Sequence, residues 1–131
     1  MTTAPLDVAH PGMEGLTNDA LAQVAIYFQA LSEPTRLQIL NLLRQRERNV
    51  GELAQLCACS TANMSRHLAL LTLHGFVVRE SRGNCAYYSV ADRSVYQLCD
   101  WVCGSIARHF ERSAPSREAF GALDSRTGGA L

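Results

Sequence analysis

The fold predicted for this chain is decided by residues 60–83, STANMSRHLALLTLHGFVVRESRG. The stretch begins with Ser60, a good helix N-cap, because a serine hydroxyl can accept hydrogen bonds from the unpaired amides of the first helical turn. Three apolar residues then recur at i, i+4 and i+7 on one helical face, Met64, Leu68 and Leu71. Gly75 can take the left-handed conformation that commonly ends a helix. The stretch therefore predicts a helix from Ser60 to Gly75 that runs directly into a strand.

The opposite face of this predicted helix carries small or hydrogen-bonding residues, Ala62, Asn63, Ser65, Arg66 and Ala69. A helix that buries one side and presents short polar groups and an arginine on the other suits the major groove of DNA. An ordinary amphipathic helix with a solvated face fits the same pattern. The helix alone favours neither interpretation, so the neighbouring segments decide between them.

The neighbouring segments complete a helix-turn-helix followed by a β-hairpin. Residues 52–56, ELAQL, predict a short preceding helix, and the link CACS at 57–60 has room only for a tight corner. Residues 76–80 and 86–90 have the pattern of two strands, joined by a turn at Gly83-Asn84. The predicted fold class is mainly α with a small β-hairpin, a winged helix-turn-helix in the order α-α-α-α-β-β-α.

Several motifs agree in order and spacing with one known family. They are ALSEPTRLQIL at 30–40, VGELA at 50–54, MSRHL at 64–68 continuing to Gly75, and the wing at 83–90. On these motifs the chain resembles the ArsR/SmtB family of small bacterial repressors, whose members are winged-helix homodimers. The resemblance covers roughly residues 20–110.

Three more helices are predicted outside these segments, at about residues 19–31, from residue 34 to an end that carries Arg44, Arg46 and Arg48, and at about residues 93–112. The second is expected to bury Leu37, Leu40 and either Leu42 or Leu43, and Asp92 is expected to cap the last. The predicted domain organisation is a flexible arm at 1–17, a winged-helix DNA-binding and dimerisation domain at 18–112, and a disordered tail at 113–131.

The first and last of these helices carry more apolar surface than a small wing-bearing core can cover. The resemblance implies that they form the interface of a homodimer, and the alternative is a monomer in which they pack internally. A two-fold dimer presents two recognition helices to successive major-groove faces of double-stranded DNA. The predicted partner is therefore an operator with an imperfect palindrome.

Composition limits the function classes. A chain of 131 residues, 47% hydrophobic, is long enough for one domain with its own core. It contains no apolar run of the roughly 20 residues that a membrane helix needs and no recognisable leader, so we expect a cytoplasmic protein without membrane partners. It also contains no phosphate loop, nucleophile–base pattern or carboxylate pair, so an enzyme is not expected.

The charge distribution favours a nucleic-acid partner, although the net charge of the chain is zero. Residues 1–35 contain four acidic and no basic residues, a net −4. Residues 36–82, which include the helix-turn-helix, contain seven arginines and three glutamates, a net +4. The positive charge is thus concentrated in the segment predicted to bind DNA.

The candidate DNA contacts lie on the recognition helix and at the wing. Arg66 can contact guanine or phosphate, and Asn63 can pair with adenine. His67 lies to the side of the exposed face and is assigned either a backbone contact or a hydrogen bond to the body of the protein. Arg79 lies near the base of its strand and is interpreted as a solvated charge. The complete predicted set is Ser60, Thr61, Asn63, Ser65, Arg66, His67, Arg82 and Asn84.

The resemblance also implies an effector, because regulators of this family release DNA when a metal ion, arsenite or an oxidant reaches a cysteine or histidine site. Two of the family's sites are absent here. Its zinc site opens with Asp-x-His, and the chain has Ser94 two residues after Asp92. Its Cys-Val-Cys pattern for arsenic and cadmium falls on Asn-Val-Gly at residues 49–51.

Cysteines remain the candidate sensors. The chain has five, an odd number that argues against a disulfide framework. Cys99 and Cys103 are spaced i, i+4, so two thiolates can meet one soft ion, and two chains can supply four. Three thiolates suit arsenite, and four suit cadmium, lead or zinc. Interface packing and a strained, redox-active disulfide are the alternatives for this pair.

Cys57 and Cys59 are the second choice for the metal site. They occupy positions where the resembled family has Leu-Gly-Leu, so the alternative is that both thiols replace buried leucines. This comparison leaves Ala58 where the family has a glycine, a departure that the sequence does not explain.

The predicted function is a homodimeric transcriptional repressor released from its operator by a thiophilic metal or metalloid, with no cofactor needed for DNA binding. A thiol-based redox or reactive-sulfur sensor of the same fold is one alternative. A winged-helix protein-interaction module is the other, and only the near-zero net charge favours it.

Overall fold

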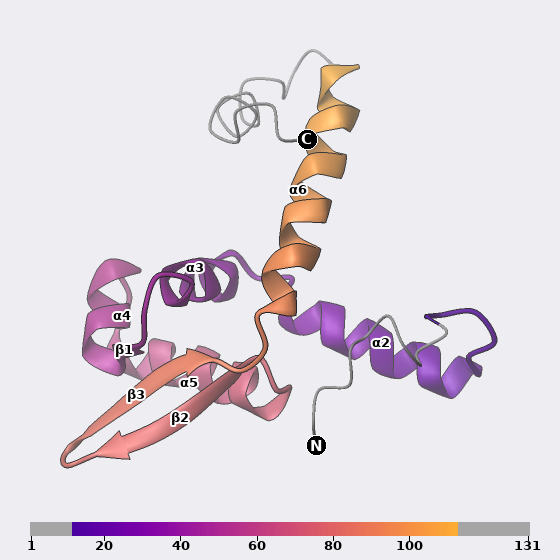
Figure 1. Cartoon of the computed structure of the whole chain (residues 1–131). Helices are drawn as coiled ribbons and strands as arrows, with labels where there is room; N and C mark the ends of the chain where they lie inside the picture. The colour runs from indigo at the N-terminus through magenta and orange to yellow at the C-terminus, as the bar shows by residue number, and fades with distance from the viewer. Residues whose placement is uncertain (1–11, 113–131) are drawn as a thin grey trace.

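The computed structural model describes residues 12–112, which form five helices and a small three-stranded sheet (Figure 1). The predicted arm and tail therefore lie mainly outside the described residues. In chain order the elements are α2 (Asn18–Ala30), α3 (Pro34–Leu43), β1 (Arg48–Asn49), α4 (Val50–Leu56), α5 (Thr61–Leu73), β2 (Val77–Arg82), β3 (Cys85–Val90) and α6 (Ser94–Glu111). The predicted winged helix-turn-helix is confirmed.

The predicted ends of α5 are confirmed by its caps. The Ser60 hydroxyl accepts a hydrogen bond from the Asn63 amide at 3.1 Å. At the other end, Gly75 has a φ of 81°, in the left-handed region that favours glycine. Helix α4 starts with a reciprocal capping box, in which the Asn49 and Glu52 side chains each accept from the other residue's amide.

The core of the body lies where α3, α4 and α5 meet the inner face of the sheet. Its largest fully buried side chains are Ile39, Leu40, Leu53, Met64, Leu68, Leu71 and Val77. Each contributes about 1.5–3 kcal/mol through removal of its surface from water. This core holds the helix-turn-helix and the base of the wing as one unit.

Three predictions about local structure are wrong. Leu37 is 41% exposed, because the buried stripe of α3 follows Ile39, Leu40 and Leu43, and Leu37 lies to its side. The N-cap position of α6 is Arg93, although the Asp92 carboxylate does accept from the Ser94 amide at 2.9 Å. Finally, the second helix was expected to carry Arg44, Arg46 and Arg48 at its end, but α3 ends at Leu43 and Arg48 begins β1, a strand too short to show a periodicity in the sequence.

The sheet has the order β1-β3-β2 and is antiparallel throughout. In its hairpin, Arg79 faces Tyr88 and Arg82 faces Cys85. Successive residues of a strand point to opposite faces, so Arg79 shares a face with the buried Val77, whereas Arg82 lies on the other face. The two wing arginines are therefore directed to different sides of the hairpin.

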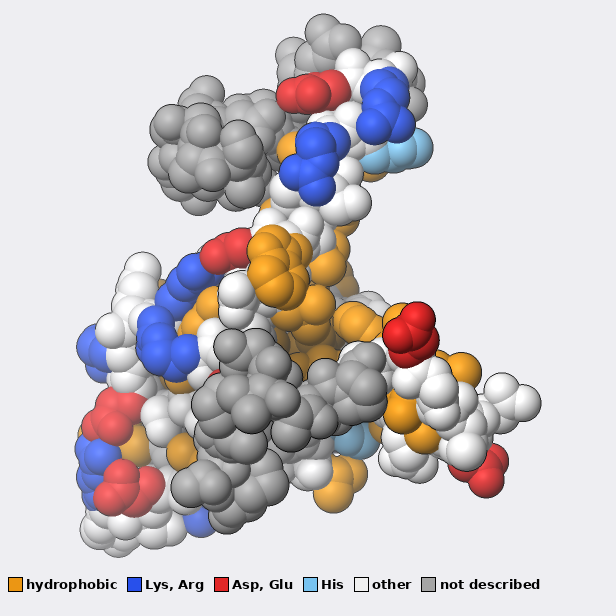
Figure 2. All heavy atoms as spheres, turned by 45° about the vertical axis from the view of Figure 1, so that its right-hand side comes forward, with side chains coloured by type: hydrophobic (Ala, Val, Ile, Leu, Met, Phe, Trp, Pro, Cys, Tyr) orange, Lys and Arg blue, Asp and Glu red, His pale blue; other side chains and the backbone are white. Residues whose placement is uncertain are grey.

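Helices α2 and α6 project from the body and make few contacts with the rest of the described chain (Figure 1). Large apolar side chains on them are exposed, among them Phe28 at 47% and Val102 at 45%. Figure 2 shows hydrophobic side chains gathered along α6 and in the hollow between α6 and α2. Within residues 12–112, no helix combines the length and the apolarity needed to cross a bilayer.

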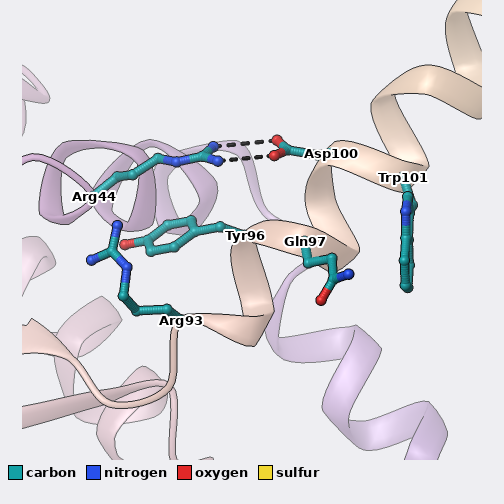
Figure 3. A pocket seen from close by; sticks show the side chains of 6 residues that line it. All are labelled: Arg44, Arg93, Tyr96, Gln97, Asp100 and Trp101. Atoms are coloured by element: carbon teal, nitrogen blue, oxygen red, sulfur yellow. Dashed lines mark hydrogen bonds and ion pairs between the residues drawn. The ribbon is translucent and has the colours of Figure 1, made fainter. Parts of the chain in front are cut away.

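The base of α6 is nevertheless attached to α3 (Figure 3). The Tyr96 hydroxyl donates to the Leu40 carbonyl at 2.7 Å, and Arg44 pairs with Asp100 at 2.9 Å. The hydrogen bond from Arg44 lowers the pKa of Asp100 below its usual value. Both side chains of the pair are largely exposed, so it contributes about 1 kcal/mol or less. The buried Tyr96 is therefore the stronger of these two attachments of α6 to α3.

Ala58, at the corner between α4 and α5, has a φ of 54°. This left-handed conformation costs an L-residue with a Cβ roughly 1–2 kcal/mol. Glycine adopts this conformation without strain, which explains why the resembled family has a glycine at this position. With alanine at position 58, the corner is a site of backbone strain.

We expect Ala58→Gly to raise the free energy of unfolding by about 0.5–1 kcal/mol, because the relieved strain exceeds the added entropy of the unfolded chain. Urea unfolding at one fixed protein concentration measures the change. The matched control is Ala69→Gly, at a solvent-exposed position in the middle of α5, which should lower the free energy of unfolding by about 1 kcal/mol. Equal destabilisation by both substitutions would contradict the assignment of strain to Ala58.

Candidate nucleic-acid interface

The recognition helix α5 presents its polar residues to solvent. Thr61, Asn63, Ser65 and Arg66 are exposed, whereas Met64, Leu68 and Leu71 are fully buried. Three side chains that enter the core fix which face of α5 points outward. The exposed face has the width and chemistry that a major groove accepts.

Two residues of this exposed face are already joined. The Arg66 guanidinium donates to the side-chain oxygen of Asn63, one helical turn earlier. Within residues 12–112 the other Arg66 donors and the side-chain amide protons of Asn63 have no hydrogen-bond partner, so the pair can present a combined set of donors to base edges or phosphates. The Ser60 oxygen accepts from the Asn63 amide and keeps its own proton for donation.

His67 lies at the edge of this face and is partly buried. Its Nδ1 lies 3.3 Å from a guanidinium nitrogen of Arg36. Because a guanidinium can only donate, Nδ1 is the acceptor in this contact. The contact favours the structural role for His67 over the DNA-backbone role, since one ring nitrogen is engaged within the protein.

Arg82, at the end of β2, is engaged by two carboxylates. Its guanidinium forms ion pairs with Glu47 and Glu80 and lies 4.8 Å above the centre of the Tyr87 ring. The hydrogen bond from Arg82 lowers the pKa of Glu47, so this acid stays ionised near neutral pH. The positive charge of Arg82 is thus balanced on its own face of the wing. Asn84 is exposed at the hairpin turn, as expected.

A groove of about 470 Å³ separates the inner side of the wing from the helix-turn-helix. Its walls include Thr61 at the start of α5, residues 49–51 at the start of α4, and Arg79, Ser81 and Asn84 of the wing. Arg79 donates to the Ser81 hydroxyl at 3.0 Å and has no carboxylate partner in the described part of the chain. Arg79 is therefore the wing arginine that is free to meet a phosphate.

From the sequence, Arg79 was interpreted as a solvated charge, and Arg82 was predicted to be the DNA contact of the wing. The period-2 alternation of the strand is the sequence signal that distinguishes the two arginines, because it places Arg79 on the same face as the buried Val77. The ion pair between Arg82 and Glu47 joins residues 35 positions apart and has no sequence signal.

The candidate sensor cysteines are all partly buried thiols. Burial raises the pKa of Cys99, and the neighbouring Cys103 and Asp100 raise it further. Burial and the nearby Cys59 likewise raise the pKa of Cys57. Within residues 12–112, no group of three or more metal-ligating side chains is close enough to hold an ion. One chain thus offers at most two sulfur donors at either pair.

Known proteins share this arrangement. The family model described as a helix-turn-helix domain matches residues 31–80. The HTH-type transcriptional regulator NmtR of Mycobacterium tuberculosis is 39% identical over 85 residues, which are 65% of this chain and 71% of that protein. The chain belongs to the ArsR/SmtB family. As a member of this family it is a DNA-binding transcriptional regulator and not an enzyme.

A solved structure from Mycobacterium bovis supports the same conclusion. It is the homodimeric winged helix-turn-helix DNA-binding domain of Mb0332, a possible ArsR-family regulator. It is 32% identical to this chain, covers 78% of it and 97% of its own length, and has a TM-score of 0.64. A cadmium resistance regulatory protein, a CadC homolog of Staphylococcus aureus, is 38% identical over 78 residues, which are 59% of this chain and 64% of that protein.

We expect Arg79→Ala to reduce the salt dependence of DNA binding, because a lost phosphate contact lowers the slope of log K against log[salt] by about 1. Fluorescence anisotropy of a labelled promoter duplex at several NaCl concentrations measures the slope. The control is the charge-neutral double variant Glu47→Gln/Arg82→Gln, which should keep the wild-type slope. If the slope were reduced in the double variant but not in Arg79→Ala, the phosphate contact of the wing would be assigned to Arg82 instead.

Proposed function

We propose that this protein is a homodimeric repressor that binds an imperfect palindromic operator and is released from it by a thiophilic metal or metalloid ion. The observation that carries the DNA-binding step is the exposed polar face of α5 opposite three fully buried side chains. Binding needs no cofactor, because the contacts come from side chains already in place. As bacterial operators lie in the cytoplasm, we expect the repressor to act there.

The exposed apolar surfaces of α2 and α6 support the dimer. Leu21, Ile26 and Phe28 on α2 and Val102 on α6 would be covered by a second copy. The homodimeric relative from M. bovis supports the same assembly. A two-fold axis would set two α5 helices roughly one DNA turn, about 34 Å, apart. Double-stranded DNA with two related half-sites is therefore the proposed partner.

Cys99 and Cys103 are the proposed effector ligands. They lie four residues apart on α6, and Val102 between them is exposed on the surface assigned to the dimer. Two copies of α6 would together provide four thiolates, which suits cadmium, lead or zinc, and three of them would suit arsenite. The cadmium resistance relative supports a thiophilic ion.

The second pair, Cys57 and Cys59, is less suited to sensing. Both side chains pack against the hydrophobic core at the corner of the helix-turn-helix, whereas of the first pair only Cys99 is among the side chains packed against it. Ligation there would expose core surface, which costs stability. We therefore keep Cys57 and Cys59 as the second choice for the metal site.

The DNA-binding step is tested by Arg66→Ala. Operator affinity should fall by about 1–3 kcal/mol, a factor of roughly 5 to 150, while the unfolding midpoint is unchanged. Anisotropy titration of a duplex from the protein's own promoter measures the affinity. Arg108→Ala, in the last turn of α6, is the control and should bind like wild type. Wild-type affinity in Arg66→Ala would remove this residue from the interface.

The release step is tested with a panel of arsenite, cadmium, lead, zinc and peroxide added to the reduced protein–operator complex. At least one ion should release the wild-type protein, and Cys99→Ser/Cys103→Ser should resist that ion. Because the pKa of Cys99 is raised and ligation removes a thiol proton, ion affinity should increase as the pH rises above 7.

The matched variant in this panel is Cys57→Ser/Cys59→Ser. A response lost only in this variant would move the site to the corner of the helix-turn-helix. Release by peroxide alone would favour the redox or reactive-sulfur alternative. If no agent releases wild type, the proposed sensing is wrong while DNA binding stands.

A further inference from the structure

Three helices meet at the side chain of Arg36, in the first turn of α3. Its Nε donates to the Ala30 carbonyl of α2 at 2.6 Å, and a terminal nitrogen lies 3.4 Å from the Gln29 carbonyl. The other terminal nitrogen lies 3.3 Å from Nδ1 of His67 on α5. One guanidinium thus contacts the end of α2 and the middle of the recognition helix.

The contact with α2 has a clear physical basis. The last carbonyls of a helix have no amide partner within it and carry the negative end of the helix dipole. Arg36 supplies both a donor and a positive charge to this end. Its own backbone is held at the start of α3, where the Glu33 carboxylate accepts from the Thr35 amide at 2.7 Å and from the Arg36 amide at 3.2 Å.

The contact with α5 lies beside the DNA-facing residues. His67 follows Arg66 directly and occupies the boundary between the buried stripe and the exposed face. The buried stripe holds α5 in the core, whereas the Arg36 contact restrains rotation of the helix about its own axis. Base readout by hydrogen bonds tolerates misplacement of only about 0.5 Å or 10–20°. A small rotation of α5 would therefore reduce recognition of specific bases.

We propose that Arg36 is a positioning residue that couples α2 to the recognition helix through His67, so that the position of α2 in the dimer sets the orientation of α5. This inference rests on the proposed operator binding. Coupling of this kind is reciprocal, so operator binding would also favour one arrangement of α2. Arg36 makes this coupling without contacting DNA.

The proposed coupling and a purely structural role of Arg36 have different effects on the specificity for DNA sequence. Phosphate contacts from Arg79 and other exposed arginines tolerate a rotated α5 better than base contacts do. Loss of the coupling should therefore weaken binding to the operator and leave binding to an unrelated duplex almost unchanged. General destabilisation would weaken both in proportion.

The experiment compares wild type, Arg36→Gln, His67→Ala and the double variant on a promoter duplex and on a scrambled duplex of equal length. Arg36→Gln should lose about 5- to 30-fold in operator affinity and stay within about twofold on the scrambled duplex. If Arg36→Gln does not fold, His67→Ala tests the same contact from the α5 side. The double variant should bind the operator no more weakly than the weaker-binding of the two single variants, because both substitutions remove the same interaction.

Arg44→Gln is the matched control, since Arg44 also links α3 to a peripheral helix, through Asp100, but makes no hydrogen bond to α5. It should keep the wild-type ratio of operator to scrambled affinity. Full operator affinity in Arg36→Gln and His67→Ala, or additive losses in the double variant, would overturn the coupling alone. A wild-type protein that binds both duplexes equally would overturn the proposed operator binding, and the coupling with it.

Discussion

Burial of Met64, Leu68 and Leu71 beneath α5 is the constraint on which the rest of this structure depends. The three side chains are fully buried, and together they contribute on the order of 5–9 kcal/mol. This is comparable to the whole stability of a small domain, about 5–15 kcal/mol. Helix α5 therefore cannot turn its polar face inward without unfolding the body. The outward direction of Asn63 and Arg66 is a direct consequence of core formation.

The peripheral helices have no comparable anchor within one chain. Phe28 and Val102 are about half exposed, and α6 is attached to the body mainly through Val95 and Tyr96 at its base. Among the described residues, α2 is attached to the body through Ala30 and the contact of Tyr27 with Phe76, and α6 through the base that carries Tyr96. The recognition helix is thus held by more fully buried side chains than the helices proposed to form the dimer.

The parts predictable from sequence are those that depend on local periodicity and caps. The apolar residues spaced at the helical period and the flanking Ser60 and Gly75 were sufficient to define α5. Together with the hairpin turn, they were sufficient to predict the winged helix. The ion pair of Arg82 with Glu47 and the contact of Arg36 with His67 were not predictable, because each joins residues more than 30 positions apart. Ala58 was predictable in part. The resemblance identified it as an unusual residue for its position, and only its positive φ explained why the family has a glycine there.

The charge balance indicates how sensitive such a regulator is to a small structural change. The chain has no net charge, and Arg82 and Arg44 are balanced by carboxylates. Arg66 and Arg79 have no carboxylate partner among the described residues, so they can still provide sequence-independent attraction to phosphates. The proposed operator affinity would combine these contacts with base contacts made by a correctly oriented α5. Because 1.4 kcal/mol changes the binding constant tenfold, a rotation of α5 that costs a few of these contacts would be enough, under the proposed mechanism, to release the DNA.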